Sequence, residues 1–124
     1  MAEEYINTID STNFEGQKTV LNAINNAVSL KDIKGSIDVC DCITMAGKRK
    51  GRNGAPDSDC QNTYLITPDG TAYFTQSDGI ARSVRAIAKL IPDFGKSTEK
   101  GFITLAVYTK PLDNGNTVKT LVMP

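Results

Sequence analysis

The feature that most constrains the fold is a hairpin signal in the middle of the chain, NTYLITPDGTAYFT (62–75). Two runs rich in β-branched and aromatic residues flank a turn, where Pro68 suits the first turn position and Gly70 can take a positive φ. This composition predicts a three-residue loop with a bulge, in which Thr67 pairs with Thr71. The pairing assigns neighbours to the two faces of the hairpin: Tyr64 with Phe74 on one face, and Leu65 with Tyr73 on the other.

A two-residue period extends the β-structure on both sides of this hairpin. From Ser36 to Met45 apolar and polar residues alternate, except that Asp41 interrupts the apolar row. Such an interruption indicates a bulge or bend, as in a long strand shared by both halves of a small barrel. Near the C-terminus, FITLAVYT and TVKTLVM predict two more strands, joined by a turn at Asp113, Asn114 and Gly115.

The first of two predicted helices runs from Asn13 to about Val28. Its apolar residues fall near one face of the 3.6-residue period: Phe14, Leu21, Ile24 and Val28. The residues that could cap its N-terminus are Ser11, Thr12 and Asn13.

The second predicted helix begins at Ser77 or Asp78 and runs to about Ile91, before Pro92. Its expected buried face consists of Ile80, Val84, Ile87 and Ile91. A second stripe of the helix is cationic, with Arg82, Arg85 and Lys89. We interpret this stripe as a solvated helix face.

The resulting order is α-β-β-β-α-β-β, in one domain that spans residues 1–124. A five-stranded Greek-key barrel with a helix between its third and fourth strands is the OB-fold arrangement, so we predict a mostly β, OB-fold-like barrel preceded by an N-terminal helix. Other five-stranded barrels and an open α+β sheet share this order. Residues 1–12 are expected to form a mobile leader.

Positive charge is concentrated in the segment GKRKGRNG, although the formal net charge of the chain is zero. Residues 1–46 contain seven acids and three lysines, a balance of minus four, and the remaining residues compensate with plus four. Turn-forming residues follow the basic segment, so residues 46–60 are predicted to be a long exposed basic loop. Because local field decides whether a polyanion is attracted, a neutral total does not exclude nucleic acid.

Several functional classes are disfavoured by what the chain lacks. It has no histidine and three cysteines, Cys40, Cys42 and Cys60, which we interpret as reduced thiols without a metal site. No phosphate-binding glycine motif occurs, and no apolar run is long enough to span a membrane. We therefore expect a cytoplasmic, non-enzymatic protein without a cofactor.

A sequence-tolerant binder of single-stranded nucleic acid needs cations for the phosphates and flat rings on which bases stack. The chain offers both kinds of residue near the predicted barrel face. The candidates are Lys48, Arg49, Lys50 and Arg52 for the phosphates, and Tyr64, Tyr73 and Tyr108 for the bases. A solubilising loop and tyrosines that fill the core would explain the same residues.

Several segments together resemble the single-stranded-DNA-binding protein of phi29-type phages, which replicate linear genomes by protein priming. They follow in order through nearly the whole chain: NFEGQKTVLNA (13–23), YLITPDGTAYF (64–74), IARSVRAIAKLI (80–91), GFITLAVYT and TVKTLVM. The basic segment departs from the resemblance, because the corresponding family segment is less cationic.

The resemblance implies an abundant early phage protein that coats displaced single strands during viral DNA replication and protects them from nucleases. Its expected partners are single-stranded DNA and phage replication proteins, with stacking roles for Tyr64 and Tyr73. The alternative is a phage or bacterial binding module that captures a host protein or a nucleotide-like ligand. The residues alone do not decide between a monomer and a weak homo-oligomer. They also do not decide between a preference for DNA and a preference for RNA.

Overall fold

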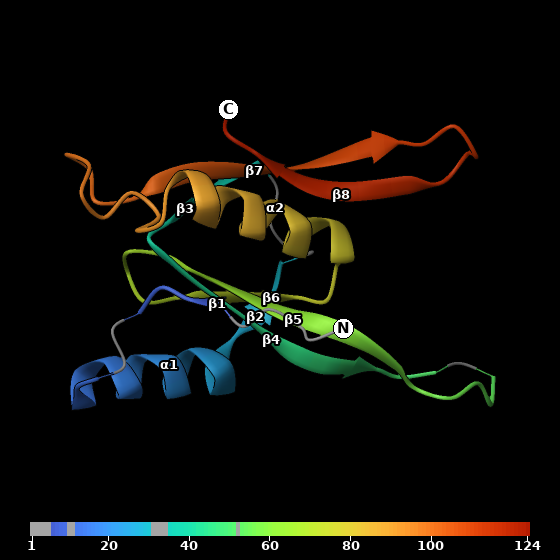
Figure 1. Cartoon of the computed structure of the whole chain (residues 1–124), viewed down its shortest axis with the longest axis horizontal. Coiled ribbons are helices and arrows are strands. Elements are labelled where there is room, and N and C mark those ends of the chain that lie inside the picture. Colours follow the sequence, from blue (N-terminus) through green and yellow to red (C-terminus); the bar gives the residue numbers. More distant parts are fainter. Residues whose placement is uncertain (1–5, 10–11, 31–34, 52) are drawn as a thin grey trace.

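The computed structural model describes residues 6–9, 12–30, 35–51 and 53–124, which form two helices and two sheets (Figure 1). The larger sheet has the strand order β1-β4-β5-β6-β2 and the smaller has the order β3-β7-β8. The elements are β1 (Ile6–Asn7), α1 (Phe14–Asn26), β2 (Val28–Ser29), β3 (Ser36–Val39), β4 (Asp41–Arg49), β5 (Ser58–Ile66), β6 (Ala72–Thr75), α2 (Asp78–Leu90), β7 (Ile103–Pro111) and β8 (Thr117–Val122).

The central hairpin forms in the predicted register. The backbone N–H of Thr67 donates to the Thr71 carbonyl at 2.9 Å, and Gly70 has a φ of 90°. Its two faces enter different hydrophobic clusters. Leu65 lies in a cluster between the two sheets, whereas Tyr64 lies in a smaller cluster on the outer face of the larger sheet.

The bend predicted at the interrupted apolar row is confirmed. β3 ends at Val39 and β4 begins at Asp41, and the two strands belong to different sheets. The Asp41 carboxylate accepts hydrogen bonds from the Thr8 hydroxyl at 2.7 Å and from Lys96 Nζ at 2.6 Å. A polar residue therefore stands at the bend because it ties the chain to two other segments.

The β-rich class is confirmed, but the predicted barrel is not, because the described residues form two sheets that do not close on each other. Helix α2 covers the edge of β8 on the side away from β7. The Leu121 N–H, which another strand could have bound, donates to the Ser83 hydroxyl at 3.0 Å. The Ser83 side chain thus takes the place of a neighbouring strand for this backbone N–H of β8. The sheets are therefore not joined between β6 and β8, and the space between these strands stays open.

Helix α1 has the predicted N-cap, because the Asn13 side chain accepts a hydrogen bond from the Gly16 N–H at 2.8 Å. Of the apolar residues that the sequence places near one face of this helix, only Ile24 packs against the smaller cluster. Phe14 is 73% exposed and Leu21 is 59% exposed, while α1 packs on the outer face of the larger sheet through smaller residues centred on Ala23. Residues 20, 23, 24 and 27 have an equally good helical period, so the pattern alone could not select the face.

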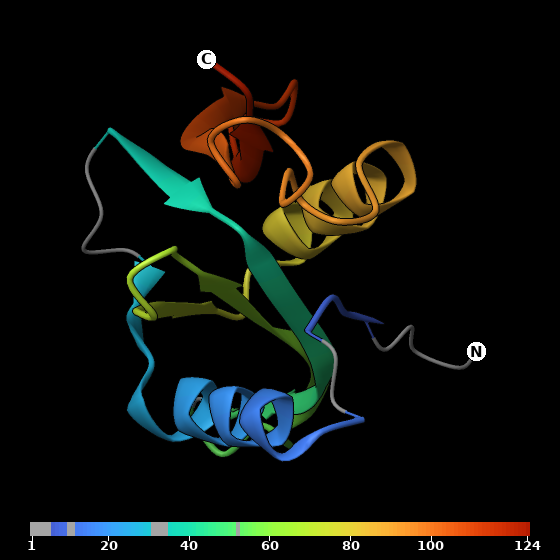
Figure 2. The same cartoon turned by 90° about the vertical axis from the view of Figure 1, so that its left-hand side faces the viewer.

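Helix α2 matches the prediction at both ends and on its buried face. Ser77 caps it, and its buried residues include Ile80, Val84 and Ile87. Figure 2 shows α2 between the two sheets and α1 on the opposite side of the larger sheet. The inter-sheet cluster therefore receives apolar side chains from both sheets and from α2.

The two-residue strands β1 and β2 were not predicted. β1 lies within the expected leader 1–12, and it pairs Ile6 with Thr44 of β4. β2 pairs in parallel with β6, so the segment predicted as the end of the first helix is extended at Val28. Strands this short show no period in a sequence. Within the described part of the chain, no helix is long and apolar enough to cross a bilayer.

Candidate functional site

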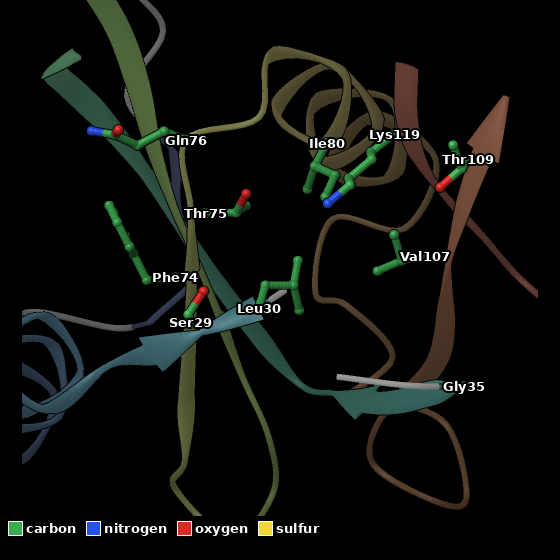
Figure 3. Close-up of a pocket in the computed structure, with 10 residues that line it drawn as sticks. All are labelled: Ser29, Leu30, Gly35, Phe74, Thr75, Gln76, Ile80, Val107, Thr109 and Lys119. Atoms are coloured by element: carbon green, nitrogen blue, oxygen red, sulfur yellow. The ribbon is translucent and has the colours of Figure 1, made fainter. Parts of the chain in front are cut away.

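The open side of the molecule holds a cleft between the two sheets, with a volume of about 480 Å³. Two hairpins project from the molecule at this end (Figure 1). We call them the β4–β5 arm (46–51 and 53–61) and the β7–β8 arm (108–120). The cleft residues drawn in Figure 3 come from β2, β6, α2 and the β7–β8 pair. Leu30 and Gln76 directly follow β2 and β6, and Gly35 precedes β3.

The cleft combines an apolar floor with polar side chains. Leu30, Ile80 and Val107 supply the floor, and Figure 3 shows Lys119 extending over it beside Ile80. Thr109 lies opposite Lys119 in the β7–β8 register. No carboxylate in the described residues forms an ion pair with Lys119. A flat or apolar group could therefore rest on the floor while an anionic group meets the ammonium.

The basic segment is more ordered than predicted. β4 continues through Arg49 and β5 begins at Ser58, so the connection between the strands spans 50–57 and not 46–60. Lys48 is paired with Asp59 across the ladder, and Arg49 with Ser58. Antiparallel pairing satisfies the backbone of these residues despite the neighbouring glycines, which is why the strand extends into the predicted loop.

Nearby acceptors engage two of the basic side chains. Lys48 forms an ion pair with Asp59, although both side chains are largely exposed. Arg49 Nη2 donates to the Gln76 carbonyl at 2.7 Å and lies 3.6 Å from an Asp78 carboxylate oxygen. Lys50 is exposed, and Arg52 lies outside the described residues. The arm thus presents less uncompensated charge than its sequence suggests.

The side chain of Gln76 links the base of the β4–β5 arm to the end of β6. Its Nε2 donates to the Lys48 carbonyl at 3.1 Å and to Asn62 Oδ1 at 3.0 Å. In Figure 3 this side chain points away from the cleft, although its residue lines the rim. The arm is therefore fixed at its root relative to the cleft.

The three candidate tyrosines are not brought together. Tyr64 is only 6% exposed, and its ring centroid lies 5.2 Å from that of Phe74 beneath α1. Burial raises the pKa of its hydroxyl. With α1 in place, this ring offers no free face to a ligand.

Tyr73 and Tyr108 occupy different surroundings. Tyr73 lines a second pocket beside Phe102 and the β5–β6 turn, where the charged lining residues are Asp38 and Asp69. Tyr108 is 49% exposed on β7, opposite Thr120. Its neighbour Val107 points into the cleft, so the strand alternation places Tyr108 on the outer face of the smaller sheet. None of the six candidate site residues that the structure describes lines the cleft.

Sequence reasoning missed Lys119, although a signal for it exists. In TVKTLV, Lys119 shares a strand face with Leu121, which is only 8% exposed. A lysine on the inward face of a strand is unusual and draws attention to that position. Thr75 and Thr109 also line the cleft, but no feature of the sequence indicates their position there.

The three thiols do not form a common site. Cys42 lies in the inter-sheet cluster, Cys60 is buried on β5, and Cys40 is half-buried at the β3–β4 bend. Burial, together with the Asp41 carboxylate, raises the pKa of Cys42 to about 12, so this thiol stays protonated at neutral pH. Among the described residues, no three His, Cys, Asp or Glu side chains are grouped to hold a metal ion.

Comparison with known proteins identifies one family for nearly the whole chain. A family model described as "Phage Single-stranded DNA-binding protein", of the phi29 type, matches residues 1–121. No curated protein and no solved structure gives a significant match.

Proposed function

The chain belongs to the phi29-type phage single-stranded DNA-binding proteins, and we propose that it coats the single strands displaced during phage DNA replication. The match of the family model to residues 1–121 carries this proposal. In this role the protein protects the strand from nucleases and acts without catalysis.

The strand enters the cleft between the two arms. Lys119 meets a phosphate, and a base or sugar rests on the floor formed by Leu30, Ile80 and Val107. The cations of the β4–β5 arm, Lys48, Arg49, Lys50 and Arg52, raise the positive potential along the approach to the cleft. Among the three tyrosines that the structure describes, Tyr108 is the exposed one and is available for stacking beyond the cleft.

The same parts explain a weak dependence on base sequence. A lysine contact to a phosphate carries no information about the base, and an apolar floor accepts any base by its flat face. In an OB-fold, oligonucleotides lie on the face of strands two and three between the loops L12 and L45. The two arms occupy corresponding places in the strand order, with one difference: α1 covers the outer face of β5 and β6.

The test is a titration of the protein with oligo-dT of increasing length, followed by tyrosine fluorescence at low and moderate salt. The chain has four tyrosines and no tryptophan, so tyrosine emission is not masked. We expect saturation at a fixed number of nucleotides per protein. The logarithm of affinity should fall with the logarithm of salt concentration by about 0.7 for each phosphate contacted.

The control is a duplex of the same length, whose linear charge density is higher than that of the single strand, so that a preference for the single strand cannot come from phosphate charge alone. Equal affinity for duplex and single strand would contradict the proposal. Tight binding of a mononucleotide, with no gain on lengthening the oligomer, would favour the nucleotide-binding alternative.

A further inference from the structure

The pocket that Tyr73 lines is acidic, and in this it differs from a site that binds phosphate. It encloses about 400 Å³ beside the β5–β6 turn, where Tyr73, Phe102 and Pro68 provide apolar surface. Its charged lining residues are Asp38 and Asp69, and none of the residues that line it is cationic. We call it the turn pocket.

Both carboxylates of the turn pocket are held in place. Asp38 accepts a hydrogen bond from the Thr104 hydroxyl at 2.8 Å. Asp69 accepts from the Thr67 hydroxyl and from the Thr71 N–H at 3.0 Å, and these bonds lower its pKa. Two fixed negative charges beside aromatic rings suit an alkylammonium or guanidinium group, whose methylene stem packs on the rings.

A cation of this kind lies at the opposite end of the same molecule. Along the longest axis, the β5–β6 turn is at one end and the tip of the β4–β5 arm is at the other (Figure 1). Lys50 follows the last paired residue of β4 and is exposed. No carboxylate in the described residues forms an ion pair with it, in contrast to Lys48 and Arg49.

We propose that Lys50 on the β4–β5 arm of one copy docks in the turn pocket of the next copy, so that copies line up head to tail along a DNA strand. The inference rests on the proposed function, because the strand is what aligns the copies. Opposite charges at opposite ends make the contact heterologous, and a heterologous contact whose rotation does not close repeats along an open line. It therefore gives neighbouring copies a preference to bind side by side.

The experiment uses two charge reversals, Lys50→Glu and Asp38→Lys, in the full chain. Each variant alone places like charges at the contact. Lys50→Glu brings a third acid to Asp38 and Asp69, and Asp38→Lys sets a second cation against Lys50 while Asp69 stays in place. In an equimolar mixture the two variants become complementary, because the glutamate of one copy meets the lysine of the other. Rescue by mixing two defective proteins is not expected from a purely structural defect.

Affinity is measured on a short oligo-dT that holds one protein and on a long oligo-dT that holds many. The ratio of the long-strand to the short-strand affinity isolates the contact between neighbours from any loss of phosphate binding. We expect each variant alone to lower this ratio roughly five- to tenfold, and the mixture to restore it. A variant ratio equal to that of the unsubstituted protein, or a mixture no better than its components, overturns the contact.

A failure of the proposed function gives a different result. If the unsubstituted protein does not bind even the short strand, the proposed function is wrong. Sedimentation of the concentrated mixture without DNA then tests whether the contact between copies forms. Complexes found in the mixture but in neither variant alone would support it. Single copies throughout would overturn it.

Discussion

The two hairpins that project from one end of the molecule hold their cations in different ways (Figure 1). In the β4–β5 arm, carboxylates lie close to Lys48 and Arg49, and Gln76 fixes the root of the arm. In the β7–β8 arm, Lys119 reaches the cleft without an ion pair to any described residue. The uncompensated cation at the cleft is therefore a single lysine on an inward strand face and not a member of the dense basic run.

The largest effect is expected where the arms join the body. A Cβ on Gly79 would overlap the backbone carbonyl of Lys119 and lie 2.7 Å from a Val118 methyl carbon. Overpacking against backbone costs about 1–3 kcal/mol, and a helical alanine returns up to about 1 kcal/mol. Gly79→Ala should therefore lower the free energy of unfolding by about 1–2 kcal/mol in urea denaturation.

The matched control is Gly47→Ala at the root of the β4–β5 arm. A Cβ there would meet the side-chain amide of Asn62, which can rotate away more easily than a backbone can move. The loss should be smaller than for Gly79→Ala. A larger loss at Gly47 would show that the β4–β5 arm has the more rigid root.

The next effect concerns affinity for DNA. Lys119→Ala should weaken binding to oligo-dT about three- to tenfold and reduce the salt slope by about 0.7, because one phosphate contact disappears. Lys110→Ala is the control within the same arm, since Lys110 lies on the strand face opposite to that of Lys119. If the two variants lost the same affinity for oligo-dT, the position of Lys119 in the cleft would give it no special role in binding.

A third substitution weakens the attachment of the β4–β5 arm at its root and leaves the charge of the arm unchanged. Gln76→Ala removes two hydrogen bonds, to the Lys48 carbonyl and to Asn62, without changing the net charge. We expect a stability loss of about 1 kcal/mol, with faster hydrogen exchange of the β4–β5 arm than of the β7–β8 arm. If hydrogen exchange became faster by the same factor in both arms, Gln76 would not act on the root of the β4–β5 arm alone.

The smallest effect tests the partial neutralisation of the β4–β5 arm. Asp59→Asn removes the carboxylate that pairs with Lys48, so the arm becomes more positive. At low salt, binding to oligo-dT should become about twofold tighter, and the gain should disappear at high salt because exposed charges are screened. Weaker binding would show that the ion pair holds Lys48 in a productive position.

Local chemistry was sufficient for the central hairpin and for the second helix. The register of β5 and β6 follows from a turn that only a few residue types can form, and Ser77 and Pro92 limit α2 from its two sides. The bend between β3 and β4 was visible because one carboxylate interrupts an apolar row. These features depend on residues close together in the chain.

The tertiary structure decided which surfaces meet. Two faces of α1 had acceptable helical periods, and only packing on the outer face of β5 and β6 left Phe14 and Leu21 exposed and Tyr64 buried. The pairing of Lys48 with Asp59, the open edge beside α2 and the position of Lys119 in the cleft also join residues far apart in sequence. The sequence by itself determined the hairpin, the limits of α2 and the family, whereas the cleft and the charge that reaches it depend on long-range contacts that no local pattern encodes.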